Sequence, residues 1–121
     1  LSGKLLIETL PEFFKAKIMP QEQHHEKATF TKKFTTDDAF VNPVELQSAI
    51  TGENEFLAIK IERMMRALNP EPGVWTYGAV RGKLVVIGGE KRLKLLCGKI
   101  SDASLLLQEV QQEGKVPVQL F

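Results

Sequence analysis

The sequence has 121 residues, a hydrophobic fraction of 43% and a formal net charge of +1. This length suits one small domain, alone or with a tail, and the near-neutral charge excludes a global field that would draw the whole chain to nucleic acid. No apolar run approaches the roughly 18 residues of a membrane-spanning helix, so we expect no membrane contact. A single cysteine, Cys97, excludes an intramolecular disulfide and is typical of a reducing cytosol.

The first predicted element is an amphipathic helix over residues 4–18, whose apolar residues recur near i, i+4 and i+8. Pro11 should kink this helix or mark its true start. The chain begins without Met or a signal-peptide pattern, and we interpret Leu1 as a cut inside a longer protein. Because a lone helix this short is marginal in water, its face around Phe13 and Phe14 predicts self-association.

Residues 20–43 form a long polar connection. A stretch of this length without regular structure is unusual inside a compact domain, so an interdomain linker is the favoured interpretation. Its aromatic residues Phe30, Phe34 and Phe40 indicate that it lies on a surface. Asp37 and the aspartate after it could cap a short turn.

Two helices should follow, over residues 43–50 and 53–68. The second has the strongest pattern, with apolar residues at i, i+4, i+7 and i+11. Asn69-Pro70 should end it, because proline lacks an amide proton and pushes the preceding residue out of the α region. Glu71-Pro72-Gly73 then predicts a tight turn, after which the only tryptophan, Trp75, begins the first strand.

Short strands are predicted over residues 74–80, 83–88, 91–100 and 104–111, with a possible edge strand at 116–118. Gly88-Gly89 and Ser101-Asp102 are typical of hairpin connections. If the third strand is extended, Leu93, Leu95 and Cys97 share its apolar face. Helices followed by a small antiparallel sheet indicate the α+β class.

The sequence offers no convincing catalytic or metal-binding group. His24-His25-Glu26 has no partner at metal-ligand spacing and is more simply a solvated linker. Cys97 has no evident low-pKa environment, so a core position is favoured over a nucleophile. Asp37-Asp38 could be paired acids, although the capping role is simpler. No glycine-rich phosphate loop opens a helix, and we expect no cofactor site in this chain.

The charge pattern of residues 81–99 is more informative, because six basic residues stand there against one acid, Glu90. A basic sheet face suits contacts with phosphates, which position nucleic acid without reading its sequence. A soluble strand surface whose lysines protect the edges explains the same pattern equally well. The basic residues are Arg81, Lys83, Lys91, Arg92, Lys94 and Lys99.

Residues 66–76, Arg-Ala-Leu-Asn-Pro-Glu-Pro-Gly-Val-Trp-Thr, resemble the signature RALNPWPGAWT at the head of the C-terminal domain of the methionyl-tRNA formyltransferase family. Residues 5–11 resemble the last helix of that family's catalytic domain. Residues 21–33 are similar to its interdomain linker, and Asp37-Asp38 matches an acidic turn. The resemblance covers nearly the whole chain.

The resemblance implies an enzyme that transfers a formyl group from formyl-tetrahydrofolate, its co-substrate, to the methionyl amine of initiator tRNA in the cytoplasm. The family's catalytic Asn, His and Asp lie in the N-terminal domain and cannot be mapped here. The chain would comprise the last catalytic-domain helix (1–19), the linker (20–43) and a C-terminal OB-like domain that contacts tRNA (44–121). The family's basic tRNA-facing surface would correspond to Lys32, Lys33, Arg66, Arg81, Lys83, Lys91, Arg92, Lys94 and Lys99.

Some residues depart from the family pattern or allow other interpretations. Glu71 replaces the signature's tryptophan, and the chain is shorter than a five-stranded barrel requires, which predicts a small antiparallel OB-like open barrel. Arg66 could equally serve as a cation at a helix C-terminus. The parent is expected to be a monomer. The alternatives are a related formyltransferase that acts on a nucleotide sugar or on folate, and a non-enzymatic module that binds protein.

Overall fold

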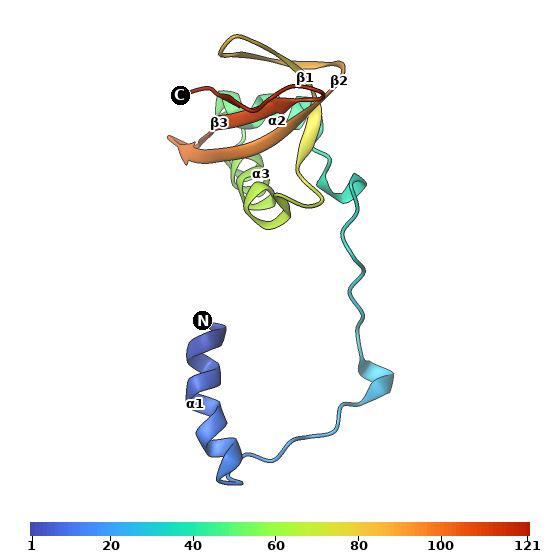
Figure 1. Ribbon diagram of the computed structural model, residues 1–121, viewed down its shortest axis with the longest axis vertical. Coiled ribbons are helices and arrows are strands. Elements are labelled where there is room, and N and C mark those ends of the chain that lie inside the picture. The colour runs from blue at the N-terminus through green and yellow to red at the C-terminus, as the bar shows by residue number, and fades with distance from the viewer. The chain divides into compact units, whose positions relative to one another are not determined.

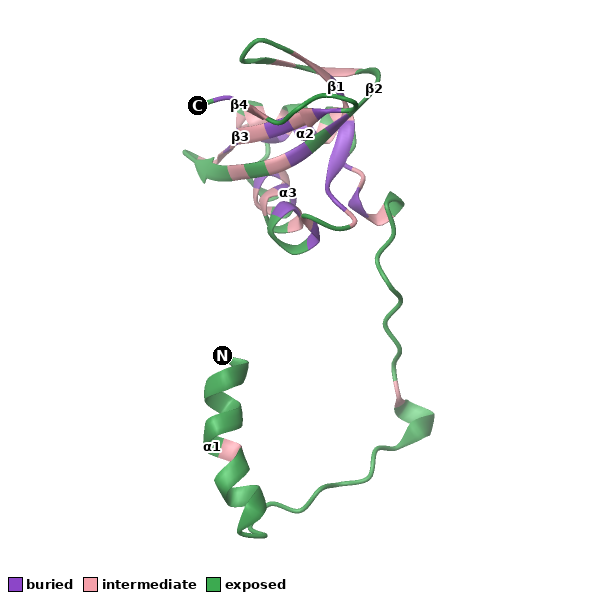
Figure 2. Ribbon diagram, viewed as in Figure 1, coloured by how far each residue is buried: buried purple, intermediate pink, exposed green.

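The computed structural model describes all 121 residues, which form two compact units, Leu1–Lys32 and Lys33–Phe121. The first unit contains helix α1 (Ser2–Phe14) and a 3₁₀ turn, His25–Lys27. Helix α1 continues through Pro11 and ends four residues before the predicted boundary. Its apolar side chains are exposed, Phe14 to 79% and Ile7 to 74%, and Figure 2 shows the helix almost entirely in the colour of exposed residues.

The second unit contains a 3₁₀ turn and two helices ahead of its sheet (Figure 1). Asn42 caps α2 (Pro43–Thr51) by accepting a hydrogen bond from the Val44 N–H at 2.9 Å. Asn54 caps α3 (Glu55–Leu68) in the same way, through the Leu57 N–H at 3.1 Å. The 3₁₀ turn is Asp37–Ala39, and the Asp38 carboxylate accepts bonds from the backbone and hydroxyl of Thr35.

The buried face of α3 is formed by Ala58, Ile61, Met65 and Leu68. The apolar residues predicted to form the helical stripe are Leu57, Ile61, Met64 and Leu68, widened by Phe56 and Met65; of these, Ile61, Met65 and Leu68 are buried. Leu57 and Met64 are half-buried and Phe56 is 73% exposed, so the apolar pattern extends beyond the face that packs on the sheet.

The turn between α3 and the sheet is held by one side chain. The Asn69 Nδ2 donates to the Leu95 carbonyl at 2.8 Å and to the Leu96 carbonyl at 3.1 Å. Its Oδ1 accepts from the Val74 N–H at 2.9 Å. The tight turn predicted at Glu71-Pro72-Gly73 forms, with Gly73 at φ 88° and its N–H bonded to the Leu68 carbonyl.

Four antiparallel strands form an open, barrel-like sheet in the order β1-β2-β3-β4. They are β1 (Trp75–Arg81), β2 (Leu84–Ser101), β3 (Ser104–Gln112) and β4 (Val118–Gln119). Helices α2 and α3 pack on one face of this sheet, and the residues coloured as buried lie on these helices and on the strands that they pack against (Figure 2). The largest fully buried ones include Leu46, Ile61, Leu93, Leu95, Leu105 and Val110. The predicted α+β class and open sheet are confirmed.

The extent of β2 corrects a sequence prediction, because the two strands expected over residues 83–88 and 91–100 are one strand. Gly88-Gly89 is no hairpin turn but lies within β2, where φ values of 98° and 101° bend the strand. Residues 88–91 form a bulge, because Tyr77 pairs with Arg92 while the adjacent Gly78 pairs with Ile87.

Cys97 does not share the buried face of Leu93 and Leu95. A second register shift between Leu95 and Cys97 leaves the cysteine exposed, with its sulfur 3.5 Å from Gln108 Oε1. Strict alternation of side chains fails wherever a strand carries a bulge.

Candidate nucleic-acid interface

The face of the sheet opposite the helices carries aromatic and basic residues, and we call it the outer face. Residues paired across antiparallel strands share a face. Tyr77 pairs with Arg92, and Lys94 pairs with Trp75 on one side and with Gln111 on the other. These five side chains therefore lie on the outer face, while the neighbouring Leu93 and Leu95 are buried against the helices.

Three aromatic rings form a cluster at the start of β1. The ring of Phe40 lies 4.7 Å from that of Trp75 and 5.8 Å from that of Tyr77, and the latter two are 5.4 Å apart, between centroids. The Trp75 Nε1–H donates to the Thr36 carbonyl at 2.8 Å. The tryptophan is only 7% exposed, so packing and a hydrogen bond hold it in one orientation.

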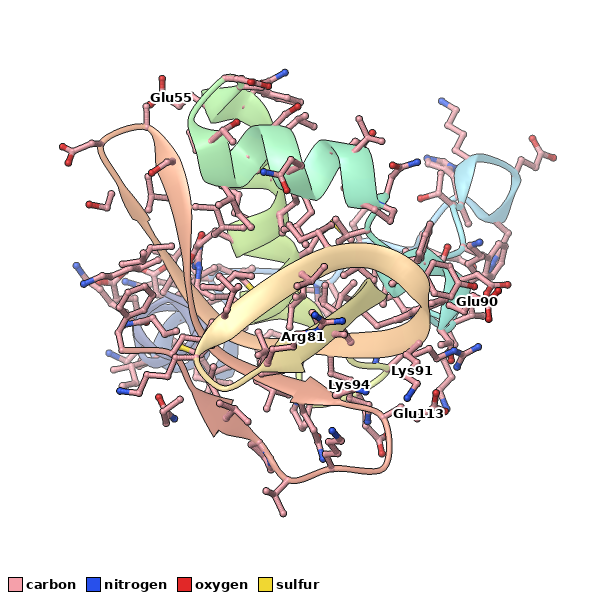
Figure 3. The ribbon with its side chains drawn as sticks, turned by 90° about the horizontal axis from the view of Figure 1, so that it is seen from above. Glu55, Arg81, Glu90, Lys91, Lys94 and Glu113 are labelled. Atoms are coloured by element: carbon pink, nitrogen blue, oxygen red, sulfur yellow. The ribbon has the colours of Figure 1, made fainter.

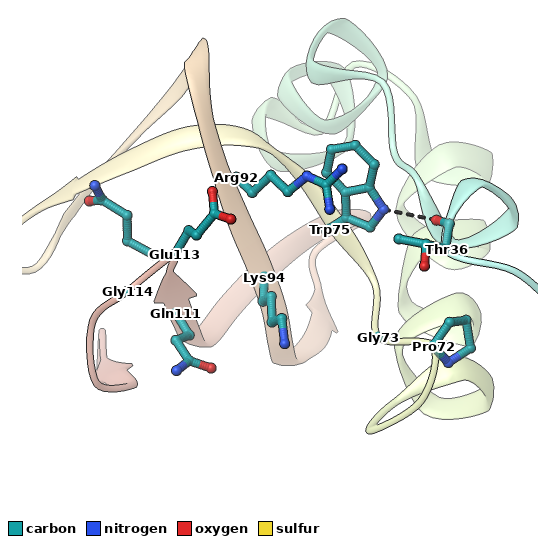
Figure 4. A pocket seen from close by; sticks show the side chains of 10 residues that line it. Thr36, Pro72, Gly73, Trp75, Arg92, Lys94, Gln111, Glu113 and Gly114 are labelled. Carbon is teal, nitrogen blue, oxygen red and sulfur yellow. Dashed lines mark hydrogen bonds between the residues drawn. The ribbon is translucent and has the colours of Figure 1, made fainter.

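Arg92 stacks on this cluster. Its guanidinium carbon lies 4.5 Å from the centroid of the Trp75 ring, within the range of a cation–π contact (Figure 4). The stacked face is apolar and the N–H edge of the guanidinium remains available for hydrogen bonds. The tryptophan thus fixes the direction in which Arg92 presents its donors.

Beside this pair is a hollow of about 240 Å³, which we call the Trp75 hollow (Figure 4). The turn before β1 borders it on one side and the turn after β3 on the other. The lining contains two cations, two amides and one carboxylate. Its residues are Thr36, Pro72, Gly73, Trp75, Arg92, Lys94, Gln111, Gln112, Glu113 and Gly114.

Four of the nine predicted tRNA-binding residues share the outer face by strand register: Arg81, Arg92, Lys94 and Lys99. Lys83 lies in the β1–β2 turn and Lys91 in the bulge, and both are exposed. Figure 3 shows Arg81, Lys91 and Lys94 grouped in one view, together with two acids, Glu90 and Glu113.

The other three predicted residues lie elsewhere. The Arg66 side chain binds Glu62 on α3, with its Nε 2.6 Å from Oε1, and this hydrogen bond, with the carboxylate's charge, raises the pKa of Arg66. Lys33 lines a separate hollow beside the end of α3. Lys32 belongs to the first unit.

Glu113 and Gln111 were missed by sequence analysis because the basic pattern stops at Lys99. Glu113 comes directly after β3, and its N–H donates to the Arg92 carbonyl at 3.0 Å. Only the strand register brings it to the basic residues. The sequence of β3, Ser-Leu-Leu-Leu-Gln-Glu-Val-Gln-Gln, does not alternate polar and apolar residues, so it carried no signal for Gln111.

The other candidate sites of the sequence analysis, for a metal ion, have no set of ligands in the structure. His24, His25 and Glu26 are exposed and line a shallow hollow in the first unit. No group of three or more His, Cys, Asp or Glu side chains is placed to hold a metal ion. No membrane-spanning helix is found, since no helix combines the required length with sufficient hydropathy.

Comparison with known proteins gives several relatives that share one name. Over 134 residues the chain is 31% identical to the methionyl-tRNA formyltransferase of Dictyoglomus thermophilum, covering 95% of this chain and 39% of the relative. The methionyl-tRNA formyltransferase of Roseiflexus castenholzii is 33% identical over 132 residues, covering 98% and 39%. That of Roseiflexus sp. strain RS-1 is 37% identical over 76 residues, covering 63% and 20%.

The chain therefore spans between 20% and 39% of the length of these relatives, and the matched region is a C-terminal portion of them. No family model matches the chain.

Proposed function

Because this chain belongs to the methionyl-tRNA formyltransferase family and matches a C-terminal portion of its members, we propose that it supplies the tRNA-binding surface of such an enzyme. The reaction would move a formyl group from formyl-tetrahydrofolate to the methionyl amine of initiator tRNA, in the cytoplasm. The groups that perform this chemistry would lie outside the chain. Residues 1–19 would end the catalytic domain, 20–43 would link the domains, and 44–121 would hold the tRNA as an OB-like domain.

The observation that carries this proposal is the gathering of cations on the outer face. Arg81, Arg92, Lys94 and Lys99 share that face by register, with Lys83 and Lys91 exposed nearby. A chain of net charge +1 thereby presents a local basic surface, which is what binding to a phosphate backbone requires. Lys32, Lys33 and Arg66 are proposed as further tRNA contacts only by resemblance to the family, and Arg66 would first have to leave Glu62.

The test is the salt dependence of tRNA binding by the 121-residue chain. Labelled initiator tRNA should bind weakly, and the logarithm of the association constant should fall linearly with the logarithm of the KCl concentration. The slope should be near −0.9 for each duplex phosphate whose counterions are released. Fluorescence anisotropy between 50 and 300 mM KCl measures it, and a salt-independent affinity, or no binding at 50 mM, would contradict the proposal.

A related formyltransferase that acts on a nucleotide sugar or on folate is the first alternative. Assay of the full-length parent on charged initiator tRNA and on a nucleotide sugar separates the two. A protein-binding module is the second alternative, and one observation favours it. A hollow of about 600 Å³ beside α3 is lined largely by apolar side chains. Phe56 and Phe34 are among them, exposed to 73% and 61%. If the parent transfers a formyl group to charged initiator tRNA, neither alternative is the main role of this protein.

The exposed apolar face of helix α1 predicts that the 121-residue chain self-associates. Leu5, Ile7 and Phe14 are each more than 60% exposed, and apolar surface of this kind drives association in water. We expect the chain to form dimers or larger species as its concentration rises, and Phe13→Ser with Phe14→Ser to restore the monomer. Light scattering across a concentration series measures this, and a strict monomer at high concentration would refute it. The parent itself would be a monomer.

A further inference from the structure

Among the cations of the outer face, Arg92 is the one whose orientation the structure fixes. A backbone carbonyl, Thr36 O, holds the Trp75 indole at 2.8 Å, and the indole in turn supports the guanidinium at 4.5 Å. Arg81 and Lys83 have no ring beneath them, and Arg66 is bound to Glu62. Resting on the proposed tRNA-binding function, we propose that the Trp75 hollow is a built site for one backbone phosphate of RNA, gripped by Arg92 and Lys94.

The donors needed for a phosphate are present and unused. The Arg92 side chain has no carboxylate within salt-bridge distance and donates to no protein acceptor, and Lys94 is likewise in no ion pair. A guanidinium stacked on a ring keeps its planar N–H fork free, which matches two phosphate oxygens at once. Lys94, two residues along the same face of β2, adds a second positive charge to the lining of the hollow.

The size of the hollow favours one group of a polymer over a whole ligand. Its volume of about 240 Å³ is below the roughly 300–1,000 Å³ of small-molecule pockets. A phosphate that projects from an RNA backbone suits a hollow of this volume, because the remainder of the nucleic acid stays outside it.

The amides of the hollow argue against reading of a base. Gln111 Nε2 donates to the Lys115 carbonyl at 2.8 Å, and Gln112 Oε1 accepts from the Val80 N–H at 3.2 Å. Side chains that would read a base edge are thus engaged in holding the turn and the sheet. The cations of Arg92 and Lys94 remain for contacts with phosphate, and such contacts position RNA without reading its sequence.

Glu113 is the element that opposes binding. Its carboxylate belongs to the lining of the hollow, on the side of the strand that bears Arg92 (Figure 4). A negative charge there repels a phosphate. Removal of this charge is therefore expected to strengthen RNA binding, which a generic loss of surface polarity would not do.

The decisive comparison uses two arginines that receive the same substitution. Arg92→Lys keeps the charge but loses the forked donor pattern, so tRNA affinity should fall by roughly fivefold to tenfold. Arg81→Lys, on the same face without a ring beneath it, should change affinity less than about twofold. Glu113→Gln should raise affinity by about twofold to fivefold. Anisotropy at 100 mM KCl measures all three, and thermal unfolding confirms that the variants fold.

A second pair tests the site without relying on Arg92. Lys94→Gln and Lys99→Gln each remove one positive charge from the outer face of β2. Only Lys94 lines the Trp75 hollow, so only Lys94→Gln should abolish phosphate binding there. Inorganic phosphate added to the ¹⁵N-labelled chain should shift the amide signals of Arg92, Lys94 and Gly114, and Lys94→Gln should remove those shifts.

The outcomes separate the two proposals. If the unaltered chain binds no tRNA, the proposed function fails. If it binds tRNA but Arg92→Lys equals Arg81→Lys, or phosphate shifts all basic residues alike, the face acts only as diffuse charge and the phosphate site is refuted.

Discussion

Replacement of Asn69 by alanine is expected to lower the free energy of unfolding by about 3 kcal/mol. This side chain makes three hydrogen bonds, to the carbonyls of Leu95 and Leu96 and from the Val74 N–H. Alanine removes all three and leaves part-buried backbone groups unsatisfied, each at a cost of roughly 1 kcal/mol. Urea unfolding followed by circular dichroism measures the change as a lower midpoint at constant m value.

The matched control is Asn54→Ala, which removes a single capping bond at the exposed start of α3. A loss of about 1 kcal/mol is typical of such a cap. If both asparagines cost the same, the connection between α3 and the sheet does not depend on the Asn69 side chain. The comparison isolates the tertiary role of Asn69 from the general effect of losing a capping residue.

Reversal of charge at Lys91, Arg92 and Lys94 to glutamate is expected to weaken tRNA binding by roughly a hundredfold or more at low salt, and to reduce the steepness of the log–log salt dependence by about 2 to 3. Arg92 and Lys94 line the Trp75 hollow, and Lys91 is the exposed residue before Arg92 in β2. A glutamate at each position adds repulsion to the lost attraction. Anisotropy with labelled tRNA across a KCl series measures both quantities.

A control variant of equal charge distinguishes a local surface from the net charge. Lys4, Lys15 and Lys17, all exposed in the first unit, can be reversed to glutamate, and each replacement changes the charge by −2. Both triple variants therefore go from +1 to −5. A comparable loss of binding in the two would mean that the overall charge, and no particular face, governs the affinity.

The α+β layout and the helix-to-sheet turn could be predicted because their signals are local. Asn69-Pro70 and Glu71-Pro72-Gly73 restrict the backbone wherever they occur, and the apolar spacing of residues 53–68 shows which side of α3 is covered. The exposure of Phe56 could not be predicted in this way, because the sequence does not show how much of the α3 surface the sheet covers.

Of the candidate site, only the concentration of basic residues could be predicted from the sequence. The cluster of residues 81–99 was visible, but the contact between Arg92 and Trp75 depends on a strand register set by the bulge at 88–91. Two adjacent glycines suggest a hairpin as readily as a bulge, and the choice decides which side chains meet across the strands. The same uncertainty misplaced Cys97, whose exposure follows from the shift after Leu95.

The short β4 and the occupied margin of β1 bear on how this sheet avoids aggregation. A free strand edge can template pairing with another molecule. At β1 the Trp75 carbonyl already accepts from the Val41 N–H, and the Val80 N–H is bonded to Gln112. At the other margin β4 has only two residues and follows Pro117, which cannot donate to a neighbouring strand. The backbone groups named here are therefore not available for pairing with a strand of another molecule.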